Sequence, residues 1–154
     1  MEGQLAHCKQ QQQQRQWKPR DPIIQKRVST PVIDDLPLPR TWPEIDAAIN
    51  RAVVVTERQP PFRIVSVNAA WERLCGYKLS QVRNRTLGSL LHGPETDTAA
   101  GTGLISQLLL ESNEAAVTLT NYKASGEKFR NRVRVGCMEE DYFVGVLQQV
   151  NDGM

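Results

Sequence analysis

The sequence predicts an α+β domain in which a five-stranded antiparallel sheet is covered by helices. Three observations support this fold class. Two strand-like segments come early, several short helical segments follow, and three further strand-like segments fill the last third of the chain. Strands grouped before and after the helices, rather than alternating with them, favour an antiparallel sheet with helices packed on one face.

The first part of the chain differs in composition from the rest. The 154 residues, 40% of them hydrophobic, suffice for one domain with an extension. Residues 1–41 hold eight Gln, five Pro, and seven Lys/Arg against four Asp/Glu, whereas the remaining chain holds twelve against thirteen. The net charge of +2 therefore arises in residues 1–41. We expect a disordered Gln/Pro-rich segment there; the alternative for the Gln run is the end of a helix of a larger protein.

The cysteines and the hydropathy pattern indicate the compartment. Cys8, Cys75 and Cys137 are odd in number and lack metal-type spacing, which argues against a disulfide framework and favours a reducing environment. No apolar run approaches the roughly 20 residues of a membrane helix, and the polar start lacks the apolar stretch of a signal peptide. We expect an intracellular protein, cytoplasmic or nuclear, without membrane contact.

Residues 42–51 are predicted to form an amphipathic flanking helix. Thr41 can cap it, Glu44 completes a capping box, and Pro43 falls in the first turn, where its missing N–H costs nothing. "AVVVTE" and "FRIVSV" then predict two strands joined by the turn "RQPP".

The middle of the chain predicts helices. "NAAWERLCGY" has an apolar stripe at helical spacing that ends at Gly76, and "KLSQVRNRTLGSLL" suggests short helical turns. "GPETDTAAGTGLISQLLLES" predicts a turn followed by a longer helix, which Thr96 or Asp97 can cap. The residues of that helix expected to face inward are Leu104, Ile105, Leu108 and Leu109.

Three strands complete the fold: two on either side of a turn at Ser125–Gly126, and "DYFVGVLQQV". Alternation along the first two places Asn121 and Asn131 on the core face. It places Arg130, Arg132 and Arg134 on the opposite face, where we expect solvent. A buried amide without a partner costs about 1–3 kcal/mol. Asn121 and Asn131 must therefore bind a polar planar ligand, or else bond to each other, to a loop carbonyl or to a trapped water.

With these elements in place, residues 52–150 resemble a PAS domain, specifically the LOV branch of flavin-binding photoreceptors. "VNAAWERLCGY", "GPETD", "TNYKASGEKFRN" and "YFVGV" carry the resemblance, in the family's order and over about 100 residues. It implies the strand order 2-1-5-4-3 with helices on one face. Residues 151–154 form a short tail.

The family's photochemical residues are not matched. The position of the cysteine that adds to photoexcited flavin in LOV domains falls at Gly88 or Leu87, depending on the direction of counting. The arginines that hold the flavin phosphate are also absent, since no Lys or Arg occurs between Arg85 and Lys123. We therefore expect no cofactor and no cysteinyl-flavin photochemistry, with FMN or riboflavin as the alternative.

Four further residues follow from the resemblance. Asn121 and Asn131 match the two asparagines that contact flavin, His92 stands where the family has a ribityl-binding Gln, and Leu147 replaces the Gln that faces the ring edge. Cys75 could supply a relocated thiol, although an inert buried cysteine is the simpler interpretation.

The outer face of the sheet is the candidate interface. Apolar and aromatic side chains occupy a face that should be solvated, which indicates a homo- or heterodimer contact assisted by the flanking helix. The alternative is that this helix covers the patch within one chain. The candidate residues are Tyr142, Val144, Val146, Val150, Tyr122, Ile45 and Ile49.

We therefore expect a LOV-like regulatory module that acts by protein–protein interaction and dimerisation, without cysteinyl-flavin photochemistry. The alternative is a sensor that binds a flavin or another planar molecule between sheet and helices. An enzyme is not expected, because no paired carboxylates, Cys–His pair or metal-binding cluster is found. Without a basic region or heptads, direct nucleic-acid binding is not expected either.

Overall fold

The computed structural model describes residues 33–110 and 113–151. The chain divides into two units, residues 1–37 and 38–154. The predicted disorder of residues 1–32 and the end of the predicted tail, residues 152–154, lie outside the described residues.

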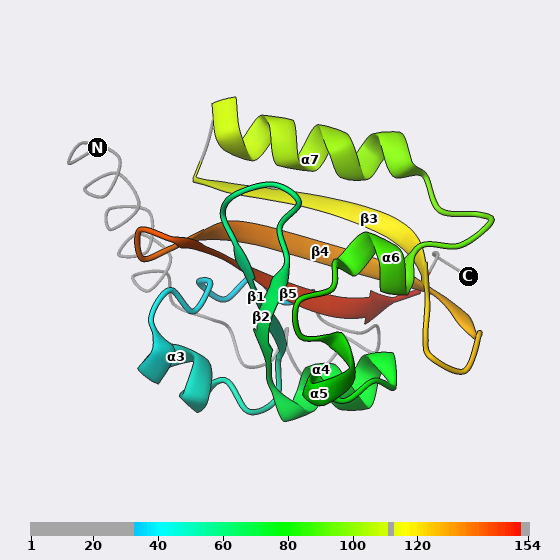
Figure 1. Ribbon diagram of the computed structural model, residues 1–154, viewed down its shortest axis with the longest axis horizontal. Coiled ribbons are helices and arrows are strands. Elements are labelled where there is room, and N and C mark those ends of the chain that lie inside the picture. The colour runs from blue at the N-terminus through cyan, green and yellow to red at the C-terminus, as the bar shows by residue number, and fades with distance from the viewer. Residues whose placement is uncertain (1–32, 111–112, 152–154) are drawn as a thin grey trace, which may run out of the picture. The chain divides into compact units, whose positions relative to one another are not determined.

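The second unit contains the predicted five-stranded antiparallel sheet, with the order β2-β1-β5-β4-β3. Helices α4–α7 lie on one face, and the short helix α3 lies on the other (Figure 1). The elements are α3 (Trp42–Ala47), β1 (Ala52–Glu57), β2 (Ile64–Val67), α4 (Ala69–Cys75), α5 (Leu79–Val82), α6 (Leu87–Leu91), α7 (Thr98–Leu110), β3 (Glu114–Tyr122), β4 (Lys128–Met138) and β5 (Tyr142–Val150).

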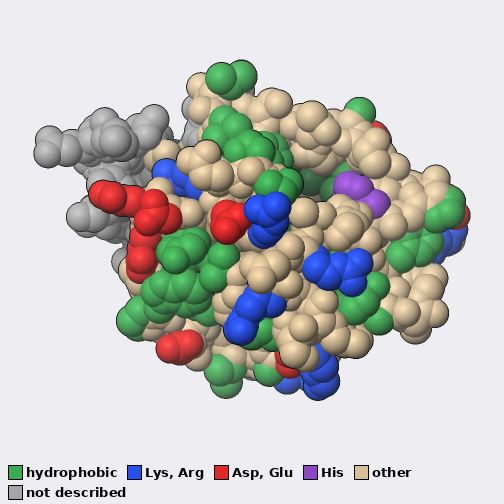
Figure 2. Space-filling model, viewed as in Figure 1, with side chains coloured by type: hydrophobic (Ala, Val, Ile, Leu, Met, Phe, Trp, Pro, Cys, Tyr) green, Lys and Arg blue, Asp and Glu red, His purple; other side chains and the backbone are tan. Residues whose placement is uncertain are grey.

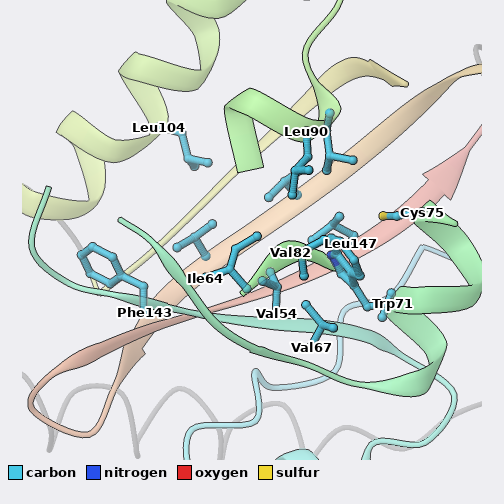
Figure 3. Packing of buried hydrophobic residues seen from close by; sticks show 14 of the residues in the cluster. Val54, Ile64, Val67, Trp71, Cys75, Val82, Leu90, Leu104, Phe143 and Leu147 are labelled. Carbon is cyan, nitrogen blue, oxygen red and sulfur yellow. The ribbon is translucent and has the colours of Figure 1, made fainter. Parts of the chain in front are cut away.

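The main core lies between the sheet and helices α4–α7. Trp71 and Cys75 point from α4 towards the sheet, and Leu104 points down from α7 (Figure 3). These side chains meet apolar residues of all the central strands, such as Val54 and Leu147. Leu108 is buried as predicted, but Leu109 is 57% exposed and does not face inward.

A second apolar cluster lies on the outer face of the sheet and is formed within the same chain. Leu38 and Ile45 pack on Val53, Val55 and further buried residues, namely Met138, Val144 and Val146. Leu38 is only 2% exposed. The folded unit therefore begins at Leu38, four residues earlier than the predicted boundary.

The flanking helix ends at Ala47, whereas the sequence predicted a helix through residue 51. The side chain of Asn68 explains the early end. Its Nδ2 donates to the carbonyls of Ala48 (3.1 Å) and Arg51 (2.7 Å), and its Oδ1 accepts from the amides of Val53 and Trp71. Asn68 thus caps α4 and at the same time fixes the turn that leads into β1.

Arg134 is buried, contrary to the prediction that it faces solvent. Its side chain is 3% exposed, and its Nε and Nη2 donate to one carboxylate oxygen of Glu114 at 3.1 and 2.8 Å. Arg40 approaches the other oxygen of Glu114 at 3.5 Å and donates to the carbonyl of Cys137. The segment at the start of the folded unit therefore covers this part of β4.

Candidate functional site

A cavity of about 510 Å³ lies between the inner face of the sheet, the β1–β2 loop, α6 and α7. This volume falls in the range typical of small-molecule sites. Much of its wall is apolar, contributed by strands of the sheet and by both helices. Apolar lining residues include Val54, Phe62, Leu91, Leu104, Ile105, Leu119, Val133, Val135 and Phe143.

The two asparagines lie in this cavity and form a hydrogen-bonded relay. Asn121 Nδ2 donates to the carbonyl of Leu91 at 3.2 Å, so its Oδ1 faces Asn131, whose Nδ2 donates to it at 2.9 Å. Asn121 and Asn131 are 3% and 0% exposed. The predicted bond of the two asparagines to each other is therefore present, and the further partner of Asn121 is the carbonyl of the last residue of α6 rather than a loop carbonyl.

One polar atom of the relay stays without a partner. Both hydrogen-bonding ends of Asn121 and the amino group of Asn131 are used, whereas the buried Oδ1 of Asn131 accepts no hydrogen bond. Such an atom costs about 1–3 kcal/mol relative to a satisfied one. The relay therefore leaves one acceptor in a residue that lines the cavity.

The other four residues predicted for the site line the same cavity: Leu87, Gly88, His92 and Leu147. His92 caps the end of α6 and is exposed; it is the side chain drawn in purple (Figure 2). A β-carbon on Gly88 would lie 3.4 Å from the imidazole, so this glycine leaves room for His92. His92 is the only titratable side chain in the lining.

A set of hydroxyl side chains in the lining was not predicted from the sequence. Thr98, Thr102 and Ser106 follow one another at intervals of four residues along α7, and Thr56 and Thr86 add two more. Residues four apart lie on one face of a helix. That spacing was the signal in the sequence, but the prediction considered only the apolar residues of the helix, of which Leu104 and Ile105 line the same cavity.

The two cysteines in the described part of the chain, Cys75 and Cys137, are both free thiols and do not line the cavity. Cys75 is 0% exposed within the main core. Burial raises the pKa of its thiol to about 12, although Lys123 lowers it in part. Cys75 is therefore protonated at neutral pH. The cavity wall holds no thiol.

The "GPETD" loop is fastened to strand β3. The hydroxyl of Thr96 donates to the carbonyl of Thr120 at 2.6 Å and accepts from the amide of Gly93. Asp97 provides the cap of α7, accepting from the amide of Ala100 at 3.1 Å. The loop thus fixes the start of α7, which forms one wall of the cavity.

The residues predicted for an interface do not form one exposed patch. Val144 and Val146 are 0% and 2% exposed, and Ile45, the buried residue of the short helix α3, is 7% exposed. The ring of Tyr142 meets Trp42 edge-on at 5.8 Å. The flanking helix therefore covers this patch within one chain, which was the alternative to a dimer contact.

The remaining interface candidates have different environments. Tyr122 is half-buried, its ring would be 2.3 Å from a β-carbon on Gly93, and its hydroxyl accepts from the amide of Glu95. Val150 is half-buried at the end of β5. Ile49 is 68% exposed.

Comparison with known proteins agrees with the fold. Residues 45–109 match the family model described as a PAS domain. The LOV domain from Erythrobacter litoralis EL346 blue-light activated histidine kinase superimposes with a TM-score of 0.60 and 29% identity, covering 66% of this chain and 97% of that one. This region has the PAS/LOV fold.

Two further similarities extend the comparison. The chain is 30% identical to "Blue-light-activated histidine kinase 2" of Erythrobacter litoralis over 110 residues, which are 68% of this chain and 30% of the kinase. The chain thus spans about a third of this relative. A LOV domain studied with a flavin analogue superimposes with a TM-score of 0.61 and 26% identity, covering 70% of this chain and 82% of that one.

Some other kinds of site are not found. Within residues 33–110 and 113–151, no group of His, Cys, Asp or Glu is arranged to hold a metal ion. The helices of the described region also include none that is long and apolar enough to cross a membrane.

Proposed function

We propose that this PAS domain is a sensor that holds a planar ligand of the flavin type in the cavity between the sheet and helices α6 and α7. The unpaired Oδ1 of Asn131 carries the proposal, because a buried acceptor in a cavity wall is stabilised by a ligand that brings an N–H donor. The similarity to a LOV domain studied with a flavin analogue supports the choice of ligand class.

The surroundings of Asn131 suit a planar ring system. The apolar residues Leu119, Val133 and Leu147 line the same cavity as the asparagine relay. Ligand sites combine such apolar walls with a small number of placed polar groups. A flavin ring offers both, since its faces are apolar and one edge carries N–H and C=O groups.

We further propose that the ligand is bound without a covalent bond to the protein. Leu87 and Gly88, the two candidates for the position of the family's reactive cysteine, both line the cavity and neither carries a thiol. Cys75 is held in the core with a protonated sulfur. Binding is then reversible, and its effect on an effector passes through changes in packing rather than through a cysteinyl adduct.

The test is reconstitution of the full chain with flavins, followed by visible absorption before and after blue light. We expect a bound flavin with vibronic structure in its blue band, and no light-induced loss of that band with dark recovery. Reversible bleaching would contradict the absence of an adduct. Absence of any bound flavin, in a protein whose fold is confirmed by circular dichroism, would contradict the proposed ligand.

Dimerisation is a second proposed role, now limited to a smaller surface. Ile49 is 68% exposed and borders a groove shared with Trp42 and Ile45. We expect the chain to self-associate through this groove, and Ile49→Ser to weaken that self-association. Light scattering over a range of protein concentrations measures it, and a monomeric chain at every concentration contradicts this role.

A further inference from the structure

Helix α7 contributes only uncharged side chains to the cavity wall. Helix α7 contains no Lys, Arg, Asp or Glu from Thr98 to Leu110. Its cavity side instead presents the hydroxyls of Thr98, Thr102 and Ser106, and His92 completes the polar set from the end of α6. Hydroxyls and imidazole can exchange hydrogen bonds with ligand hydroxyl groups in both directions.

The start of α7 is unsuitable for a phosphate. Backbone amides at a helix N-terminus are a common anion site. Here the carboxylate of Asp97 already accepts from the amide of Ala100 at 3.1 Å. A phosphate placed beside Thr98 would therefore meet a negative charge, and no Lys or Arg lines the cavity to offset it.

Thr102 is placed to accept a hydrogen bond from a ligand. Its Oγ1 donates to the carbonyl of Thr98 at 3.1 Å, within α7. The hydroxyl hydrogen of Thr102 is thus engaged within the helix, while the lone pairs of Oγ1 can still accept a hydrogen bond. A polyol offers the O–H donors that such an acceptor needs, whereas a phosphate dianion offers none.

We propose that the cavity selects a flavin with an uncharged hydroxylated tail, so that riboflavin binds at least as tightly as its phosphate ester FMN. Thr98, Thr102 and His92 provide the contacts to the tail. This inference rests on the proposed function, because it concerns the ligand of the same cavity.

The experiment measures dissociation constants of riboflavin, FMN and the tail-less ring lumichrome for the full chain, by quenching of flavin fluorescence. We expect riboflavin to bind at least as tightly as FMN and more tightly than lumichrome. FMN binding about tenfold tighter than riboflavin would overturn the inference and leave the proposed function intact, the factor being what one charge-assisted hydrogen bond provides. Binding of none of the three would refute the proposed function itself.

Two variants of the exposed residue Thr102 sharpen the result. Thr102→Arg adds a cation to the cavity wall and should raise the affinity for FMN relative to riboflavin about tenfold. Thr102→Val keeps the shape without the hydroxyl and should reduce the advantage of riboflavin over lumichrome. Unchanged ratios in both variants, with thermal unfolding as for the unmodified chain, would also overturn the inference.

Discussion

The side chain of Leu38 fills the space beside Gly136, where an added β-carbon would lie 2.6 Å from Leu38 Cδ1. This contact brings the start of the folded unit onto the outer face of the sheet. It explains why the apolar residues of β5 that suggested an interface are buried in a single chain: Leu38 and Ile45 belong to the same cluster as Val144 and Val146.

Gly136→Ala should therefore destabilise the domain by about 1–3 kcal/mol, because the new methyl group collides with Leu38 in a packed cluster. Urea unfolding measures the effect. Gly103→Ala is the matched control: an added β-carbon there has no neighbour within 4 Å, and alanine favours a helix by up to about 1 kcal/mol. Equal effects of the two substitutions would show that Leu38 does not occupy this space.

Asn68 joins three segments through hydrogen bonds of its side-chain nitrogen and oxygen. Substitutions can separate the contributions of these two atoms to stability. Asn68→Ala removes four hydrogen bonds and should cost about 2–4 kcal/mol. Asn68→Ser can still cap α4 through its hydroxyl but loses the donors to Ala48 and Arg51, so we expect a smaller loss than for alanine. Free energies of unfolding that rank the serine variant below the alanine variant would contradict the arrangement.

Glu114 is a carboxylate partner of the buried Arg134. Glu114→Gln removes the negative charge that lies 2.8 Å from the guanidinium. Since the Glu114 side chain is 31% exposed, we expect a loss of about 1–3 kcal/mol, below the range for a fully buried pair. The exposed pair of Glu95 and Lys128 is the comparison, and Glu95→Gln should leave the urea midpoint unchanged.

The burial of Cys75 predicts a pH dependence of stability at alkaline pH. Its pKa is about 12 in the folded state and 9.0 for an ordinary thiol, so above about pH 9 only the unfolded chain loses this proton. The stability due to the buried neutral thiol is then complete below that pH. It is lost as pH rises, by about 1.4 kcal/mol per unit up to the folded pKa.

The Cys75→Ala variant isolates this effect, because other groups titrate equally in both proteins. We expect the difference in free energy of unfolding between the two proteins to narrow as pH rises above about 9. A difference that stays constant with pH would mean that the thiol is not buried.

The sequence was sufficient for the sheet and for the inward direction of the asparagines, because both follow from alternation and element order. It could not reveal which partner satisfies them, since Asn121 bonds to Leu91, which lies 30 residues away. The early end of the flanking helix and the burial of Arg134 could not be predicted for the same reason. They depend on contacts of Asn68 with Ala48 and of Arg134 with Glu114, both distant in the chain.

The central claim is that the unpaired carbonyl oxygen of Asn131 receives a donor from a flavin ring. The most direct measurement compares riboflavin dissociation constants of the unmodified chain, of Asn131→Leu, and of Gln107→Leu, which removes an exposed amide from α7. We predict affinity about tenfold lower for Asn131→Leu, the loss of one buried hydrogen bond, and no change for Gln107→Leu. Riboflavin bound equally tightly by all three proteins would contradict the account.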